Sequence, residues 1–166
     1  TTLPVNTGLV SGNAKFSGTT DTLNTLRAID GVLNFPVGGG IVKIDRINYA
    51  AGNWQANMQT NNVKLDSLPL DSEAKTTVGR GFLDGNFKLA GKNNSLGLDT
   101  VNATGVAKIK IGDGIISTNN LKLNAGIWRS DLLAEEIKLR KIFADVPVEL
   151  SNPVRGKFYL NGTTEN

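Results

Sequence analysis

Apolar and polar residues alternate along most of this chain. Val10, Ala14 and Phe16 share one parity, while Asn13 and Lys15 lie between them with the other parity. The same alternation recurs in many later segments. A period of two is the pattern of a strand with one buried and one solvated face. The pattern therefore predicts an all-β fold made of strands about six to ten residues long.

The alternating segments return at a fixed spacing. Residues 12–18 (GNAKFSG) are matched 73 positions later by 85–91 (GNFKLAG), and 40–54 are matched 74 positions later by 114–128. The first segment begins a third time at 156–162 (GKFYLNG). A fixed period is typical of stacked arrays, in which each unit buries its apolar face against its neighbours. We therefore predict about two repeats of 73–74 residues with roughly six strands each, and we expect the chain to be part of a longer array.

The spacing also divides the chain. It predicts a first β repeat at 1–68, a polar connector at 69–78, a second β repeat at 79–143 and the start of a third repeat at 144–166.

Short clusters of glycine and asparagine separate the predicted strands. Such residues adopt positive φ or form local side-chain turns at little cost. The clusters lie at 38–40, 51–53, 61–62, 93–94 and 112–114. Links this short join antiparallel neighbours. We therefore predict one long, curved antiparallel sheet that folds over lengthwise into a U shape, because nothing else in the sequence would cover its apolar face.

Two kinds of segment depart from the alternation. Residues 20–29 could form a short helix capped by Asp21. Residues 131–143 have good helix propensity, but their counterpart at 55–68 is a poor helix former. Since equivalent positions should fold alike, we predict strand–turn–strand for both.

The apolar parity predicts which side chains line the interior of the folded sheet. The predicted lining residues are Val10, Ala14, Phe16, Leu33, Phe35, Ile47, Tyr49, Trp54, Met58, Val63, Leu65, Leu83, Phe87, Leu89, Ile109, Ile111, Leu121, Leu123, Trp128, Leu132, Ile137, Leu139, Phe158 and Leu160. The two tryptophans occupy the same place in each repeat, where they either pack a closed core or line an open groove.

One stretch of this face is ambiguous. Lys43 and Asp45 share the parity of Ile47, so either a β-bulge intervenes or the two charges lie at the rim of the groove. Ser117 and Asn119 occupy the corresponding positions in the second repeat.

Composition narrows the chemistry. The chain has no cysteine and no histidine, which excludes disulfides, thiolate or imidazole metal sites, and Ser-His-Asp or Cys nucleophiles. Glu135 and Glu136 are adjacent on a predicted strand and should point to opposite faces, so they cannot share a substrate. The glycine clusters lack the Gly-Lys-Ser/Thr of a phosphate-binding loop. We therefore predict a non-enzymatic protein without a metal or cofactor.

Charge and hydropathy argue against two further classes, nucleic-acid-binding proteins and proteins with a membrane-spanning segment. The net charge is +3 and the sequence pI is about 9.2, but basic residues such as Lys138 and Arg140 alternate with apolar ones. This pattern is typical of a solvated strand face, and we predict no nucleic-acid partner. No apolar run approaches the roughly 20 residues that span a bilayer.

The repeated motifs resemble a known family. The Gly-x-Ala-x-Phe-x-Gly pattern at 12–18, the glycine-rich turn at 38–40 and the segment Gly52-Asn53-Trp54-Gln55-Ala56 are similar to the C-terminal repeat region of the TamB family, the bacterial translocation and assembly module subunit. The last segment resembles in particular the cyanobacterial members and their chloroplast envelope relatives. The likeness covers nearly the whole chain, and its motifs are structural.

The resemblance implies a fold, a location and partners. The family forms a long U-shaped β-sheet, or β-taco, with a hydrophobic groove inside. Its members span the periplasm, are anchored in the inner membrane, and are implicated in phospholipid transport and in outer-membrane protein assembly beside an Omp85-type barrel. The plastid relatives link the envelope translocons. The resemblance thus implies phospholipids as partners, whereas the membrane anchor and the barrel contact would belong to regions outside this chain.

Three hypotheses follow. The first is a lipid conduit whose apolar groove carries acyl chains between inner and outer membranes. The second is a chaperone or scaffold module that handles outer-membrane β-barrel proteins, or links envelope translocons, through pairing at the sheet edges. The third is a structural β-solenoid with a fully packed interior. Exposed terminal strands also predict edge-to-edge self-association of the chain.

Overall fold

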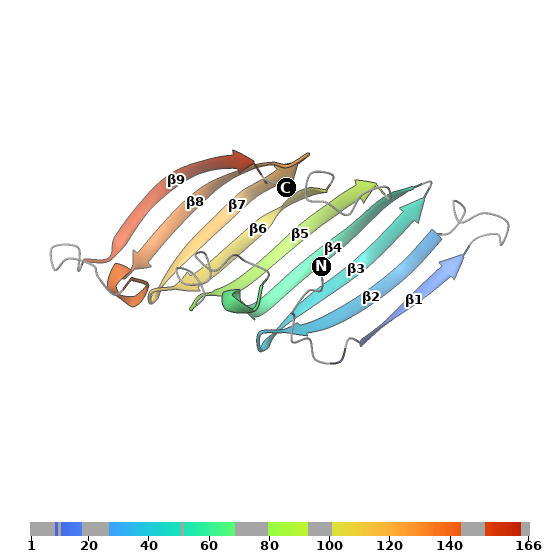
Figure 1. Ribbon diagram of the computed structural model, residues 1–166, viewed down its shortest axis with the longest axis horizontal. Helices are drawn as coiled ribbons and strands as arrows, with labels where there is room; N and C mark the ends of the chain where they lie inside the picture. The colour runs from blue at the N-terminus through green and yellow to red at the C-terminus, as the bar shows by residue number, and fades with distance from the viewer. Residues whose placement is uncertain are drawn as a thin grey trace.

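Nine strands follow one another in the order of the sequence and form one antiparallel sheet (Figure 1). The computed structural model describes residues 9, 11–17, 27–50, 52–68, 80–92, 101–143 and 152–163. The strands are β1 (Ser11–Ser17), β2 (Arg27–Val37), β3 (Gly40–Ala50), β4 (Asn53–Lys64), β5 (Phe82–Lys92), β6 (Asn102–Ile111), β7 (Gly114–Asn124), β8 (Ile127–Ile137) and β9 (Val154–Thr163). Each strand pairs with the next, so the predicted all-β antiparallel sheet is confirmed.

Tight turns join several of these strands. Gly38 and Gly39, between β2 and β3, have φ of 55° and 78°. Gly112 and Asp113, between β6 and β7, have φ of 58° and 63°. Two consecutive positive φ values are the signature of the type I′ turn, whose twist matches that of the strands it joins. The predicted clusters at 38–40 and 112–114 are therefore hairpin turns.

The described residues form fewer strands than predicted. The hairpins β3–β4 and β7–β8 begin at Gly40 and Gly114, 74 positions apart, and the structure describes four strands per interval of this length rather than six. One of the predicted turns, at Asn61 and Asn62, lies inside β4 as a bulge. At this point the pairing of β4 with β5 shifts between Thr60 and Val63, and the φ of Asn62 is 52°.

The strand–turn–strand prediction for 55–68 and 131–143 is also half wrong. The first part of each segment is a strand, but the second part is a short 3₁₀ helix, η2 (Leu65–Ser67) or η3 (Leu139–Lys141). Backbone contacts with the neighbouring turns hold both in place. The N–H of Leu65 donates to the carbonyl of Gly81 over 2.9 Å, and the N–H of Lys138 donates to the carbonyl of Gly112 over 2.8 Å.

Two other predictions fall largely outside the described residues. Most of the predicted helix at 20–29 is in this category, but its last residues, 27–29, belong to β2 and are not helical. The polar connector at 69–78 lies outside as well.

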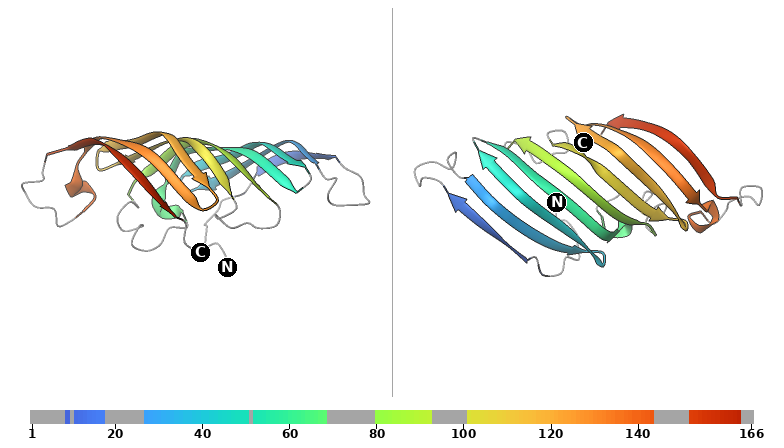
Figure 2. Two further views of the ribbon diagram at one scale, coloured as in Figure 1. Left: turned by 90° about the horizontal axis from the view of Figure 1, so that it is seen from above. Right: turned by 180° about the vertical axis from the view of Figure 1, so that it is seen from behind.

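The sheet is a single arched layer (Figure 2). In the view from above, η2 and η3 lie on its hollow side. The main buried cluster is at one end of this side, where Ile111, Ala134 and Ile137 pack together. Leu139 of η3 and Ile142 cover them. The described strands do not close on themselves, and β1 and β9 are the two edges. The stronger lengthwise folding into a U shape remains a prediction.

Candidate functional site

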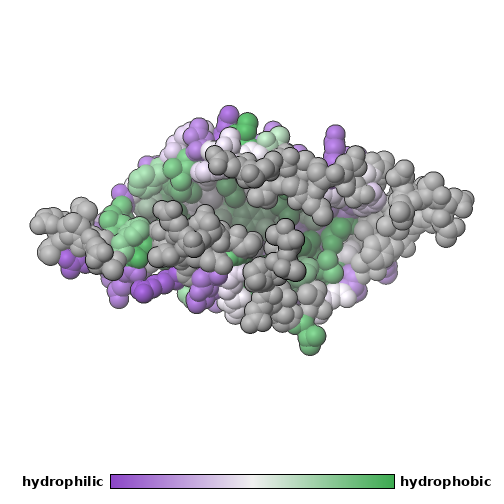
Figure 3. Space-filling model, in the orientation of Figure 1, coloured by the Kyte–Doolittle hydropathy of each residue, from purple (hydrophilic) through white to green (hydrophobic). Residues whose placement is uncertain are grey.

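One face of the sheet collects the apolar side chains. Exposed and half-buried residues alternate along β6 from Asn102 to Lys110, and Ile111 at its end is buried. Residues directly opposite each other on paired strands share a face. The cross-strand register therefore identifies the members of this surface, which we call the apolar face. Figure 3 shows hydrophobic side chains gathered in the hollowed middle of the surface turned to the viewer.

A single row of paired residues crosses six strands of the apolar face. Each residue is the register partner of the next, and none of them is charged. We call these residues the central row: Leu33, Ile44, Met58, Phe87, Gly105 and Leu121. Neighbouring strands are about 4.8 Å apart, so the five intervals between β2 and β7 make the row about 24 Å long.

A second row lies nearer the 3₁₀ helices and crosses β4 to β9. It consists of Val63, Leu83, Ile109, Ile116, Ala134 and Gly156. Val63 is completely buried. Ala134 is buried as well, and Leu139 of η3 packs against the buried cluster that contains it.

Most of the predicted lining residues lie on or against the apolar face. By register, the face includes Leu33, Phe35, Ile47, Tyr49, Trp54, Met58, Val63, Leu83, Phe87, Leu89, Ile109, Ile111, Leu121, Leu123, Trp128, Leu132, Ile137, Phe158 and Leu160. Leu65 is buried in η2, and Leu139 packs against the buried cluster from η3. Val10 lies outside the described residues, as do the side chains of Ala14 and Phe16.

Sequence reasoning missed Val42 and Ile44 because it left the parity of β3 open. The pairing of β3 with β4 shifts between Asp45 and Asn48, and Arg46 has φ of 52°. A bulge therefore intervenes, which was one of the two alternatives. The signal in the sequence was the change of apolar parity between Ile44 and Ile47.

Aromatic rings cover glycines of the neighbouring strand. A Cβ built on Gly91 would lie 2.7 Å from the ring of Trp54, and one built on Gly162 would lie 2.7 Å from the ring of Trp128. A Cβ on Gly105 would lie 2.6 Å from Cδ1 of Phe87. Each ring thus packs flat on the backbone of the next strand and pins its register. Trp54 and Trp128 remain half-buried, so they are packed against the sheet and still contribute to its surface.

Three buried polar side chains interrupt the apolar face. The hydroxyl of Ser130 donates to Oγ1 of Thr118 over 2.9 Å, and the N–H of Asn120 donates to the same oxygen over 3.2 Å. Thr60 is 8% exposed, and its hydroxyl has no hydrogen-bond partner among the described residues. Uncharged hydroxyls cost far less than charges beside hydrocarbon, so the face stays predominantly apolar.

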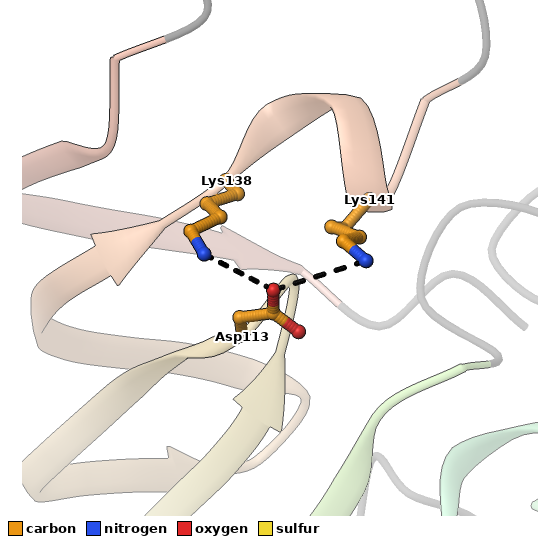
Figure 4. A network of polar contacts seen from close by, with 3 residues as sticks. All are labelled: Asp113, Lys138 and Lys141. Atoms are coloured by element: carbon orange, nitrogen blue, oxygen red, sulfur yellow. Dashed lines mark hydrogen bonds and ion pairs between the residues drawn. The ribbon is translucent and has the colours of Figure 1, made fainter.

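Charged side chains lie on the opposite face and near the ends of the strands. Asp113, in the turn between β6 and β7, reaches two lysines through Oδ2: Nζ of Lys138 at 3.3 Å and Nζ of Lys141 at 4.0 Å (Figure 4). This contact ties η3 to the turn. All three side chains are at least half exposed, so the network adds little stability.

The carboxyl group of Asp84 has a shifted pKa. Its carboxylate accepts the N–H of Asn62 over 2.7 Å and pairs with Nζ of Lys110 over 2.9 Å. These donors stabilise the charged form and hold the pKa of Asp84 below its ordinary value. The lowered pKa reflects the contact of Asp84 with the bulge of β4, and we assign Asp84 no catalytic role.

Glu135 and Glu136 do not point to opposite faces, contrary to the sequence-based argument. They form a second bulge, in β8, where the pairing with β9 shifts between Ala134 and Ile137. Both glutamates are exposed between these two buried residues. Glu136 pairs with Arg155 of β9. Its carboxylate is thus engaged in an ion pair between strands.

The depressions formed by described residues lie mainly between polar side chains. The first crosses β4 to β7 and has a volume of about 440 Å³. Residues such as Asn57, Gln59, Asn86, Lys88 and Lys122, which line it, belong to the opposite face by register. Among the described residues, no cluster of three or more acidic side chains is placed to hold a metal ion.

Comparisons with known proteins identify no relative. No protein-family model, no curated protein and no solved structure matches the chain. Within the described residues, no helix has the length and apolar character needed to cross a membrane. The functional argument therefore rests on the sheet itself.

Proposed function

We propose that the apolar face binds the acyl chains of phospholipids, and that the chain is a non-enzymatic segment of a conduit between inner and outer membranes. The observation that carries this proposal is the central row, an uncharged path across six strands on the hollow side of the sheet. Acyl chains need such a lining because an unpaired charge beside hydrocarbon is costly.

The dimensions of the row fit the ligand. One leaflet contributes about half of the roughly 30 Å hydrocarbon core of a bilayer. A row about 24 Å long therefore exceeds the length of one extended acyl chain. The phosphate headgroup would remain in water at the open side of the arch, so its charge would not need to be buried.

The proposal includes a fuller architecture than the described strands alone. The hairpins at Gly40 and Gly114 and the bulges at 61–62 and 135–136 each recur at an offset of 74 residues, which supports an organisation in repeats. Stacked repeats would prolong the central row, and a lengthwise fold into a β-taco would enclose the bound chains. The resemblance to the TamB family points to the same shape.

The same resemblance supports the proposed setting. The parent protein would lie in the periplasm, with its inner-membrane anchor and its contact with an Omp85-type barrel in regions outside this chain. The role is then the supply of phospholipid for outer-membrane biogenesis.

Photocrosslinking to lipid tests the proposal. A photoreactive residue replaces Leu121, which is half-buried on the central row, and in a matched variant it replaces the exposed Lys122. The full chain is expressed in the periplasm of a diderm bacterium, irradiated and analysed for lipid adducts by mass spectrometry. We expect phospholipid adducts at position 121 and none at 122. Equal labelling at both positions, or none at either, contradicts the proposal and favours a packed structural sheet.

A further inference from the structure

The polar face of the sheet holds a depression that acyl-chain binding does not use. It crosses β4 to β7, has a volume of about 440 Å³ and lies among strands that are each paired on both sides. Lys88 of β5, Thr104 of β6 and Lys122 of β7 are consecutive register partners within it. Amide side chains form much of the remaining lining: Asn57, Gln59, Asn86, Asn119 and Asn120. The described residues that line the depression thus supply many hydrogen-bond donors and no carboxylate.

A bulge in β7 forms one side of the depression. The register of β6 with β7 shifts between Gly105 and Ala107, opposite Asn119 and Asn120. The side-chain amide of Asn120 donates to Oδ2 of Asp131 on β8 over 2.6 Å. The carboxylate of Asp131 is therefore engaged by an amide at the bulge rather than by a cation of the depression.

Three cations follow one another along the depression and just beyond it. The register partner of Lys122 on β8 is Arg129, and the side chains of Lys88, Lys122 and Arg129 are all exposed. The ion pairs among the described residues involve other cations, namely Lys43, Lys64, Lys110, Lys138, Lys141 and Arg155. Lys122 and Arg129 lie directly opposite each other, and like charges in this arrangement destabilise a sheet.

The first repeat shows that the sheet does not require these charges. The residues 74 positions before Lys122 and Arg129 are Asn48 and Gln55. They lie opposite each other in the β3–β4 pair, as Lys122 and Arg129 do in the β7–β8 pair. Uncharged amides thus occupy the same backbone positions without the repulsion. The cations of the second repeat therefore serve a purpose other than strand pairing.

We propose that the depression binds the phosphate group of a ligand above Thr104. β5 and β7 are two strand intervals apart, about 9.6 Å, so the flexible side chains of Lys88 and Lys122 can bring both ammonium groups to one anion. The hydroxyl of Thr104 lies between them, and Arg129 adds charge beside Lys122. A phosphate has enough oxygen atoms to accept hydrogen bonds from all of these donors, whereas a carboxylate has only two.

The phosphate group can belong to a soluble phosphate ester or to a lipid surface that meets the polar face. In either case this site is independent of the proposed acyl-chain binding, because the central row is on the opposite face of the sheet. Lipid crosslinking at Leu121 and phosphate binding at Lys122 can therefore fail separately.

Two probes and two variants of the full chain test the proposal. The soluble probe is glycerol 3-phosphate, measured by titration calorimetry. The lipid probe is a vesicle of equal parts phosphatidylcholine and phosphatidic acid, measured by cosedimentation. A double variant, Lys122→Asn with Arg129→Gln, introduces the amides of the first repeat. The control is Lys92→Gln, which removes an exposed cation from the same face of β5 outside the depression.

We expect saturable binding of at least one probe, and binding about tenfold weaker for the double variant. The Lys92→Gln control should change the affinity by less than about twofold, because a distant exposed charge is screened. Binding of glycerol 3-phosphate identifies a soluble ester as a sufficient ligand, whereas binding of the vesicle alone identifies a lipid surface. The double variant should also be at least as stable to urea as the original chain, because it removes the repulsion between Lys122 and Arg129.

Several results would overturn the proposal. One is the absence of saturable binding by both probes. Another is binding that the double variant leaves unchanged, which for the vesicle would indicate contact through the apolar face. Equal weakening by Lys92→Gln would show a diffuse effect of net charge. A double variant less stable than the original chain would show that the cations support the sheet itself.

Discussion

The region β2–η2 and the region β6–η3 share a backbone plan but fill it differently. In both, the last hairpin begins at a glycine, Gly40 or Gly114, and a bulge follows in the second strand of that hairpin. Two equivalent positions near the middle of the hairpin differ. They hold Ile44 and Ala56 in the first region, and Thr118 and Ser130, joined by a hydrogen bond, in the second. The two regions therefore share the backbone of the hairpin and its bulge but differ in the side chains at the middle of the hairpin.

The bulges show the same division between shared geometry and variable chemistry. In the first region the bulge N–H of Asn62 is held by the Asp84 carboxylate of the next strand. In the second region the bulge residue is the acidic Glu136, and the next strand supplies Arg155. The two junctions thus use opposite arrangements of charge for the same backbone feature.

The largest expected effect tests the shared backbone. A Cβ on Gly40 would collide with the backbone of Asn61 and Asn62, and a Cβ on Gly114 would collide with that of Glu135 and Glu136. We expect Gly40→Ala and Gly114→Ala each to lower the free energy of unfolding by about 3 kcal/mol, measured by urea denaturation.

A turn glycine provides the control. Gly39 has φ of 78° and nothing within 4 Å of its built Cβ, so Gly39→Ala should cost only about 1 kcal/mol from backbone strain. A large loss of unfolding free energy at only one of Gly40 and Gly114 would show that the two regions do not share this close backbone contact.

A smaller effect distinguishes their buried hydroxyls. Thr60 has an unpartnered hydroxyl among the described residues, whereas Thr118 accepts hydrogen bonds from Ser130 and Asn120. We expect Thr60→Val to raise the free energy of unfolding by about 1 kcal/mol and Thr118→Val to lower it by about 1 kcal/mol. The same denaturation measurement gives both values. Changes of equal sign would show that the two sites do not differ in hydrogen bonding.

The smallest effect concerns the bulge contacts and depends on pH. The pKa of Asp84 is lowered in the folded state, so its charged form stabilises the fold at neutral pH. That contribution is lost as the pH falls below the ordinary carboxyl pKa of about 3.9 toward the lowered folded value. Asp84→Asn should cost somewhat less than about 1 kcal/mol at pH 7 and should flatten the acid limb of the stability curve.

The second junction is the matched control for this effect. Arg155 and Glu136 have side chains that are 73% and 49% exposed, so their pair is strongly screened. Arg155→Gln should therefore change stability at pH 7 less than Asp84→Asn does. A larger effect at Arg155 would reverse the ranking of the two junctions.

Much of the fold could be predicted from local patterns. Alternation identified the strands and placed residues such as Leu121 and Leu123 on the same side of the sheet, since a period of two requires no knowledge of the neighbours. The positive φ of Gly38, Gly39 and Gly112 was likewise accessible, because glycine marks such turns by its own conformational freedom. The uncharged central row follows from these two signals once the strands are aligned.

The bulges could not be predicted in this way. Asn61 and Asn62 have the composition of a turn, and only the continued pairing of Val63 with Leu83 makes them part of a strand. Likewise, adjacent Glu135 and Glu136 were expected on opposite faces, until the partner strand placed both on the exposed side.

The sequence by itself determined the strands, their tight turns and the separation of an apolar from a polar face, because these depend on backbone freedom and side-chain polarity within a few residues. Only the tertiary structure decided which turn-like pairs are bulges and which aromatic rings cover glycines. Each of these depends on the strand that lies alongside, such as β5, whose Asp84 holds the bulge at Asn62 from 22 residues away. The residues around Asn62 do not indicate which strand lies beside them, because that is set by the pairing of β4 with β5.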